Sequence, residues 1–286
     1  MSAITRPGLA PAEGPPAPAP VAPAPAAAAG PVTQARVVRA EWTKLRALRS
    51  TWWCGLSAVV LIIGLGAAIA GSGTPYHVSA GNSAATGVSA ALLGVLFAQL
   101  VIGVVGVLAF SGEYGTGMIR ATLAVVPSRL PVLWAKLIVL AGLVLPVTML
   151  CAFADFFAAT AIVSSRGGSV ISLSDPGVLR TVVGSSLYLT VVVVFGLALG
   201  ALLRKTAAGL SVFAAVFFVV PIVVGALPQK ITGFAPYLPS NAGGVLWGNP
   251  LTTAHALSPW TGLACLCGYA VVLTAAAGWR LRRRDA

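Results

Sequence analysis

Six long apolar runs constrain the fold of this chain more than any other feature of its sequence. A helix needs about 20 mostly apolar residues to cross a bilayer. Six windows meet that need: residues 52–70, 87–110, 132–163, 181–203, 206–227 and 260–279. Only 8% of the 286 residues are charged, whereas a soluble domain carries about 25%. The sequence therefore predicts an all-α membrane protein with six transmembrane helices.

The basic residues predict the orientation of these spans, because cytoplasmic loops carry an excess of Lys and Arg. With both termini in the cytoplasm, 15 basic residues lie inside and 3 outside. The outside residues are Arg166, Arg180 and Lys230. The net charge of +12 is then mainly a signal of topology in the cell membrane, and nucleic acid is not an expected partner.

Two segments flank the membrane part in different ways. Residues 1–34 form a Pro/Ala-rich stretch that cannot bury enough apolar surface to fold, so we expect a disordered cytoplasmic tail. Residues 35–286 are expected to form one six-span transmembrane domain. The four cysteines lie inside apolar runs and are expected to serve in packing.

The sequence offers no catalytic, cofactor or metal-binding motif. His77 and His255 have no neighbouring ligand at a useful spacing, and Cys265 and Cys267 do not form a CxxC pair. A phosphate-binding GxxxxGK[ST] loop is also absent from the sequence. We therefore expect that the chain is not an enzyme and binds no cofactor itself.

Residues 34–49, QARVVRAEWTKLRALR, predict a basic amphipathic helix. At helical spacing its apolar residues lie on one broad face and its basic residues mainly on the other, which is typical of a helix in the membrane interface. The alternative is a helical extension of the first span. Glu41 and Lys44, three residues apart, are expected to form a weak surface pair.

A second informative segment, residues 111–136, follows the second span. Gly112 and Gly115 are expected to open a turn, after which a short cytoplasmic helix exposes apolar side chains. Pro127 and Pro131 then end that helix and start the third span. An exposed apolar helix indicates contact with a membrane or with a protein partner.

Asp155 is the only carboxylate inside a predicted span and is a possible polar site. It lies 19 residues beyond Lys136, or about 28 Å along a helix. This distance favours an Asp near the outer interface that is solvated or paired with an Arg. A substrate or proton site is the alternative.

Four segments resemble the ABC-2-type permeases of ABC transporters, in particular the stand-alone actinobacterial type. They are EWTKLRALRSTWW at 41–53, GEYGTGMIRATLAVVPSR at 112–129, YLPSNAG at 237–243, and the ending PW-x-GL…RLRRRDA. The resemblance covers about residues 34–286, and the shared order of the motifs is its most specific part. Gly115 stands where relatives often have a basic residue.

The resemblance implies roles for two groups of residues. The amphipathic segment would be the connecting helix, with Arg39, Glu41, Trp42, Lys44, Leu45 and Arg46. Residues 113–123 would be the coupling helix that seats on a separate ABC ATPase subunit, with Glu113, Tyr114, Met118, Ile119, Arg120 and Leu123. The external segment 228–259 would partly re-enter the outer leaflet.

The same resemblance implies the working assembly. Two permease chains, identical or different, would combine with two ATPase chains in the lipid bilayer, and ATP would be bound and hydrolysed by the partner. The favoured function is the membrane subunit of an ATP-driven exporter. The alternatives are an ion-coupled secondary transporter, which would need more intramembrane charges than Asp155, and a non-transporting membrane scaffold.

Overall fold

The computed structural model describes residues 33–47, 49–72, 84–119, 130–167, 171–228, 232–248 and 257–283. Nearly all of the predicted tail lies outside the described residues. The described part from Thr33 onward is a single compact unit. It consists of helices and connecting turns, and no strand occurs within those ranges.

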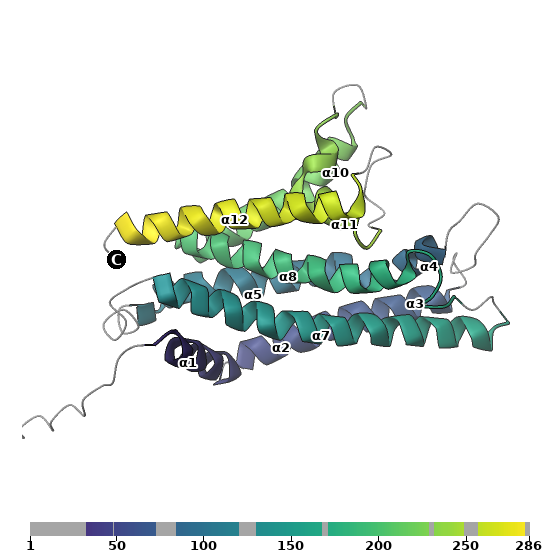
Figure 1. Ribbon diagram of the computed structural model, residues 1–286, viewed down its shortest axis with the longest axis horizontal. Coiled ribbons are helices and arrows are strands. Elements are labelled where there is room, and N and C mark those ends of the chain that lie inside the picture. The colour runs from purple at the N-terminus through teal and green to yellow at the C-terminus, as the bar shows by residue number, and fades with distance from the viewer. Residues whose placement is uncertain are drawn as a thin grey trace, which may run out of the picture. The chain divides into compact units, whose positions relative to one another are not determined.

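Six helices are long and apolar enough to cross a membrane, as the sequence predicts. The first and fifth are composite, α2 to α3 and α9 to α10, while the others are α5, α7, α8 and α12 (Figure 1). The six span Arg49–Gly71, Gly94–Gly115, Leu130–Ser165, Val178–Leu203, Thr206–Gly225 and Pro259–Arg283. Their bounds agree with the predicted windows except at the second span.

The second predicted span is broken near its start. Residues 87–110 were expected to form one helix, but α4 (Ala84–Ala91) ends in a turn before α5 (Gly94–Gly115) begins. Gly94 lies against the backbone of Leu61 and Ile62, so that a Cβ at this position would clash with it. This close approach of α5 to the first span explains why the helix is interrupted between α4 and α5, although the apolar residues continue along the sequence.

The first and fifth spans each contain one turn of π-helix. The segment η1 (Val60–Gly64) joins α2 (Arg49–Val59) to α3 (Leu65–Gly71), and η2 (Ala215–Val219) joins α9 (Thr206–Ala214) to α10 (Val220–Gly225). Such bulges shift the helical register by inserting one wider turn. Apolar periodicity does not reveal them.

Helices α5 and α8 (Val178–Leu203) form the closest contact of the bundle. A Cβ on Gly106 would meet the carbonyl oxygen of Val193, and one on Gly196 would meet that of Gly103. Small residues at such contacts let the helix backbones approach and increase van der Waals packing, which drives helix association in lipid.

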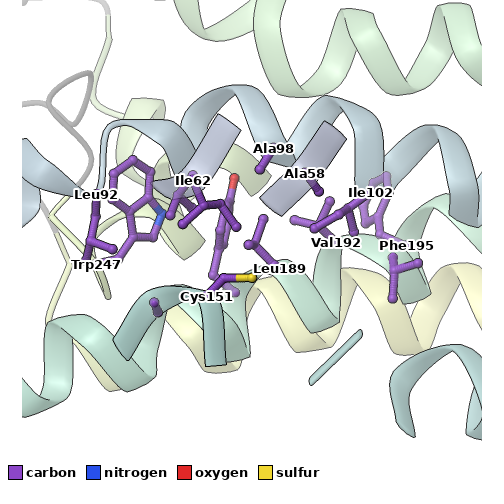
Figure 2. Packing of buried hydrophobic residues seen from close by; sticks show 14 of the residues in the cluster. Ala58, Ile62, Leu92, Ala98, Ile102, Cys151, Leu189, Val192, Phe195 and Trp247 are labelled. Atoms are coloured by element: carbon purple, nitrogen blue, oxygen red, sulfur yellow. The ribbon is translucent and has the colours of Figure 1, made fainter. Parts of the chain in front are cut away.

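The apolar core is continuous through the described bundle. Figure 2 shows Ile62 of η1, Ala98 of α5, Cys151 of α7 and Leu189 of α8 close together, with Trp247 at one side. Cys151 is buried and all four cysteines are free thiols. Cys151 thus has the packing role that the sequence predicts.

The short helix α11 (Pro239–Gly244) follows the 3-10 turn η4 (Ala235–Tyr237) and is buried at every residue. A Cβ on Gly243 would clash with both Tyr188 of α8 and Leu266 of α12 (Pro259–Arg283). Leu266 lies seven residues inside α12, about 10 Å from its start. The segment therefore returns into the bundle, in agreement with the re-entry that the family resemblance implies.

The basic residues gather at one end of the described bundle. This end, named the α1 end here, holds α1 (Gln34–Ala47), the last turn of α5 and the first turns of α7 (Leu130–Ser165). Eleven of the thirteen described Lys and Arg residues lie there: Arg36, Arg39, Lys44, Arg46, Arg49, Lys136, Arg204, Lys205, Arg280, Arg282 and Arg283. Arg166 and Arg180 lie at the other end, named the far end, where Arg166 donates a hydrogen bond to the carbonyl oxygen of Gly71.

Candidate functional site

A cluster of four charged side chains joins three helices at the α1 end. Lys136 Nζ lies 2.6 Å from Glu41 Oε2 and 2.8 Å from Glu113 Oε1. Lys44 Nζ lies 2.8 Å from Glu41 Oε1 and 3.1 Å from the same Glu113 oxygen. Each ammonium group therefore bridges both carboxylates, and the set, named the charge cluster here, is electrically neutral.

Most of the charge cluster is buried. Glu41, Glu113 and Lys136 are 3%, 9% and 6% exposed. Charges buried to this degree need complementary partners, because an unpaired buried charge is strongly destabilising. Burial lowers the pKa of Lys44, but the hydrogen bonds and negative charges of Glu41 and Glu113 outweigh it, so that the pKa is raised above its ordinary value of 10.5.

The local sequence explains how the three helices meet. Glu41 and Lys44 lie one turn apart on α1, Glu113 lies in the last turn of α5, and Lys136 lies in the second turn of α7. Beside the charges, Val37 packs against α7 in a small apolar cluster with Val132 and Ala135. The side-chain amide of Gln34 donates to the carbonyl oxygen of Pro131 at 3.1 Å. Helix α1 is thus docked on the start of α7.

This docking corrects one expectation about the amphipathic helix. The Glu41–Lys44 pair exists, but it is part of a buried network instead of a weak surface pair. The side of α1 facing the protein contains Val37 and Glu41, whereas Trp42, on the predicted apolar face, is 39% exposed. Arg39 and Arg46 are exposed, and Leu45 is half-buried.

The predicted coupling segment divides into residues with different surroundings. Gly112 does not open a turn, because α5 continues to Gly115 and the chain turns at Gly117, which has a positive φ of 71°. Glu113 is held in the charge cluster. Met118 is 49% exposed, but Ile119 is only 4% exposed, so the expectation that Ile119 lacks intramolecular cover is wrong. Arg120 and Leu123 lie outside the described residues.

Tyr114 connects the end of α5 to the turn between α8 and α9. The guanidinium carbon of Arg204 lies 5.2 Å from the centre of the Tyr114 ring, in cation–π geometry. Arg204 adopts a positive φ of 59° at the end of α8, and Thr206 donates to the Ser111 hydroxyl at 3.1 Å. Arg280 of α12 donates to the carbonyl oxygen of Leu202 at 2.6 Å. Polar contacts thus connect neighbouring helices at the α1 end.

Sequence reasoning did not find Lys136 as a member of this site. In the sequence, Lys136 is a basic residue near the start of the third predicted span, and the family resemblance assigns Glu113 to the partner-binding helix. A usable signal exists in the sequence, since the chain has only six acidic residues and two of them adjoin apolar spans on the side that carries the lysines.

The charge cluster provides ion pairing and fixes the relative positions of helices α1, α5 and α7. Within the described ranges, no group of three His, Cys, Asp or Glu residues is arranged to hold a metal ion.

Comparison with known families decides the identity of the fold. Residues 37–225 match the sequence model of a family described as ABC-2 family transporter protein. That match covers all members of the charge cluster and the first five spans. The chain belongs to the ABC-2 transporter family. Comparison with curated proteins found no significant match.

Membership makes the chain a multi-pass membrane protein and the permease of an ABC transporter. An ABC-2 permease is a membrane subunit and is not itself catalytic. In this permease the charge cluster joins α1 to α5 and α7 at the α1 end.

Asp155 lies in an unexpected environment in this ABC-2 permease. It is fully buried, and neither carboxylate oxygen has a hydrogen-bond partner among the described residues. A solvated or Arg-paired residue was expected, and this expectation is wrong. The carboxylate lies against Gly66 of α3, where a Cβ would overlap it. The distance of about 28 Å from Lys136 along α7 predicts how far along the span Asp155 lies. The sequence does not show which side of α7 faces the first span.

Proposed function

We propose that this permease is the membrane subunit of an ATP-driven exporter that is moved by a separate ABC ATPase at the α1 end. The observation that carries the proposal is the charge cluster, which fixes α1, α5 and α7 to one another beside the segment that follows α5. A partner that pushes on this segment would move three helices together, because breaking their buried ion pairs is costly.

The basic residues support an orientation in the plasma membrane in which the α1 end faces the cytoplasm. Eleven described Lys and Arg residues lie at that end and two lie at the far end, and cytoplasmic loops carry the positive excess. Helix α1 begins at Gln34 and α12 ends at Arg283, and both of these lie at the α1 end. The proposal therefore places both ends of the described chain on the side where ATP is available.

We assign contact with the ATPase to the exposed start of the segment that follows α5. Met118 is 49% exposed, next to the buried Ile119, and presents an apolar side chain at the α1 end. ATP binds the partner, and the permease contributes the membrane path, together with a second permease chain.

The test is the ATPase activity of the complex in liposomes. The permease is reconstituted with the proposed ABC ATPase partner, and ATP hydrolysis is compared for wild type, Met118→Asp and Leu227→Asp. Leu227 is 42% exposed at the far end and serves as the matched control. Met118→Asp should lower the permease-dependent ATPase rate at least about tenfold, the size expected for a charge placed in an apolar contact. Leu227→Asp should not.

Ile119→Asp is unsuitable for this purpose, because its charge would be buried inside the permease and would affect folding. An unchanged ATPase rate and unchanged co-purification with Met118→Asp would contradict the coupling role. Active ion-driven transport without any ATPase would instead support a secondary transporter.

A further inference from the structure

An apolar groove runs between the first span and the rest of the described bundle at the α1 end. Its volume is about 360 Å³, within the range of about 300–1,000 Å³ that is usual for small-molecule sites. Helices α1, α2, α5 and α7 form its walls. The lining on α2 and α7 includes Gly55, Leu56, Val59, Leu143, Val144 and Val147.

The mouth of the groove carries two tryptophans and one arginine. Trp42, Trp52 and Arg46 all line it, and the indole of Trp52 donates to the backbone carbonyl oxygen of Arg46 at 3.1 Å. Trp42 is 39% exposed and Trp52 is 66% exposed. Tryptophan prefers the level of the lipid headgroups. The groove therefore begins at the membrane surface and continues among side chains of a membrane span.

Charge distinguishes this groove from its neighbour. An adjacent cavity, of about 450 Å³, is lined by the charge cluster, in which two lysines already neutralise two carboxylates. In the first groove Arg46 is the only charged lining residue. It forms no ion pair with the described residues, and the two described carboxylates at this end, Glu41 and Glu113, are bound to Lys44 and Lys136. The first groove thus presents an available positive charge.

We propose that this groove binds one anionic phospholipid, with an acyl chain between α2 and α7 and the phosphate at Arg46. The apolar lining excludes a polar ligand along most of its length, while the basic mouth selects a negative headgroup. A lipid bound there would fill the space between the first span and α7, beside the helix that the charge cluster fixes. The site is independent of the proposed contact with an ATPase.

The test counts bound lipids on the purified permease by native mass spectrometry, after incubation in nanodiscs of phosphatidylglycerol or phosphatidylcholine. Arg46→Gln removes the charge at the mouth. Gly55→Leu fills the groove, since a Cβ there meets no atom within 4 Å. Their controls are Lys205→Gln, an exposed basic residue of the α1 end outside the groove, and Gly268→Leu, which also points into open space on α12.

Wild type should retain one phosphatidylglycerol in preference to phosphatidylcholine. Arg46→Gln should weaken that retention about fivefold, as expected for one basic residue facing an anionic lipid. Gly55→Leu should abolish it, and both controls should match wild type. Equal retention of both lipids by wild type, or unchanged phosphatidylglycerol in Arg46→Gln and Gly55→Leu, would overturn the proposal. The proposal would also be overturned if Gly55→Leu disrupted a dimer of the permease but left lipid binding unchanged, because the groove would then be a contact surface between two copies.

Discussion

Lys136 Nζ lies 2.6 Å from Glu41 Oε2, although the two residues are 95 positions apart and Lys136 belongs to a membrane span. Glu113 completes the contact from a third helix. The amphipathic helix is thus fixed to the bundle by buried charge as well as by its apolar residues. These ion pairs therefore join α1, α5 and α7 to one another at the α1 end.

Removing Lys136 should destabilise the permease strongly. Lys136→Met leaves two buried carboxylates with only the half-buried Lys44 to neutralise them, and breaking a buried pair costs about 3–5 kcal/mol. Thermal unfolding in detergent should show a lower midpoint for Lys136→Met. The double variant Glu41→Gln/Lys136→Met should recover part of the loss. Additive effects of the two single changes would contradict direct coupling.

High pH should weaken the charge cluster through Lys44. The pKa of Lys44 is raised above 10.5 in the folded chain, so its stabilising contribution is fully present below pH 10.5 and is lost as the pH rises through the folded pKa. The difference in melting temperature between wild type and Lys44→Met should therefore be constant up to about pH 10 and shrink above it. A difference that grows with pH would contradict this sign.

Gly66 should tolerate no side chain while Asp155 is present. A Cβ at Gly66 would overlap the Asp155 carboxylate, whereas Gly142 on the same bundle has open space. Gly66→Ala should lower the melting temperature, and Gly142→Ala should not. Asp155→Ala combined with Gly66→Ala should restore stability, because overpacking of about 1–3 kcal/mol would be relieved. Failure of this rescue would show that the two residues do not contact each other.

The sequence predicts the fold well because span length and hydrophobicity are local properties. Six spans, the amphipathic helix and even the segment that returns to the bundle follow from runs of residues, from periodicity or from family resemblance. The break before Gly94 and the π-turns at Val60 and Ala215 do not, because they arise from contacts between helices.

The candidate site was less predictable for the same reason. Glu41, Lys44 and Glu113 were selected from their segments, but nothing in those segments shows that Lys136 lies between the two carboxylates. Ile119 and Met118 have similar apolar character, yet one is buried and the other exposed. Asp155 was selected as an intramembrane charge, and its burial against Gly66 depends on the packing of α3 and α7.

Orientation can be tested by cysteine accessibility in intact cells, starting from a variant without the four native cysteines. Ser174→Cys at the far end should react with a membrane-impermeant maleimide, and Thr116→Cys at the α1 end should react only after permeabilisation; both residues are exposed. Asn241 is a poor probe because it is 3% exposed. The reverse labelling pattern would invert the proposed topology.

The coupling role of the α1 end is tested most directly by site-specific photo-crosslinking. A benzophenone amino acid is placed at Met118 or, as the control, at Leu227, and the permease is co-expressed with the proposed ABC ATPase partner. We expect an ATPase adduct from position 118 and none from position 227. An adduct from position 227 alone, or none from 118 in a complex that co-purifies and hydrolyses ATP, would contradict the coupling role.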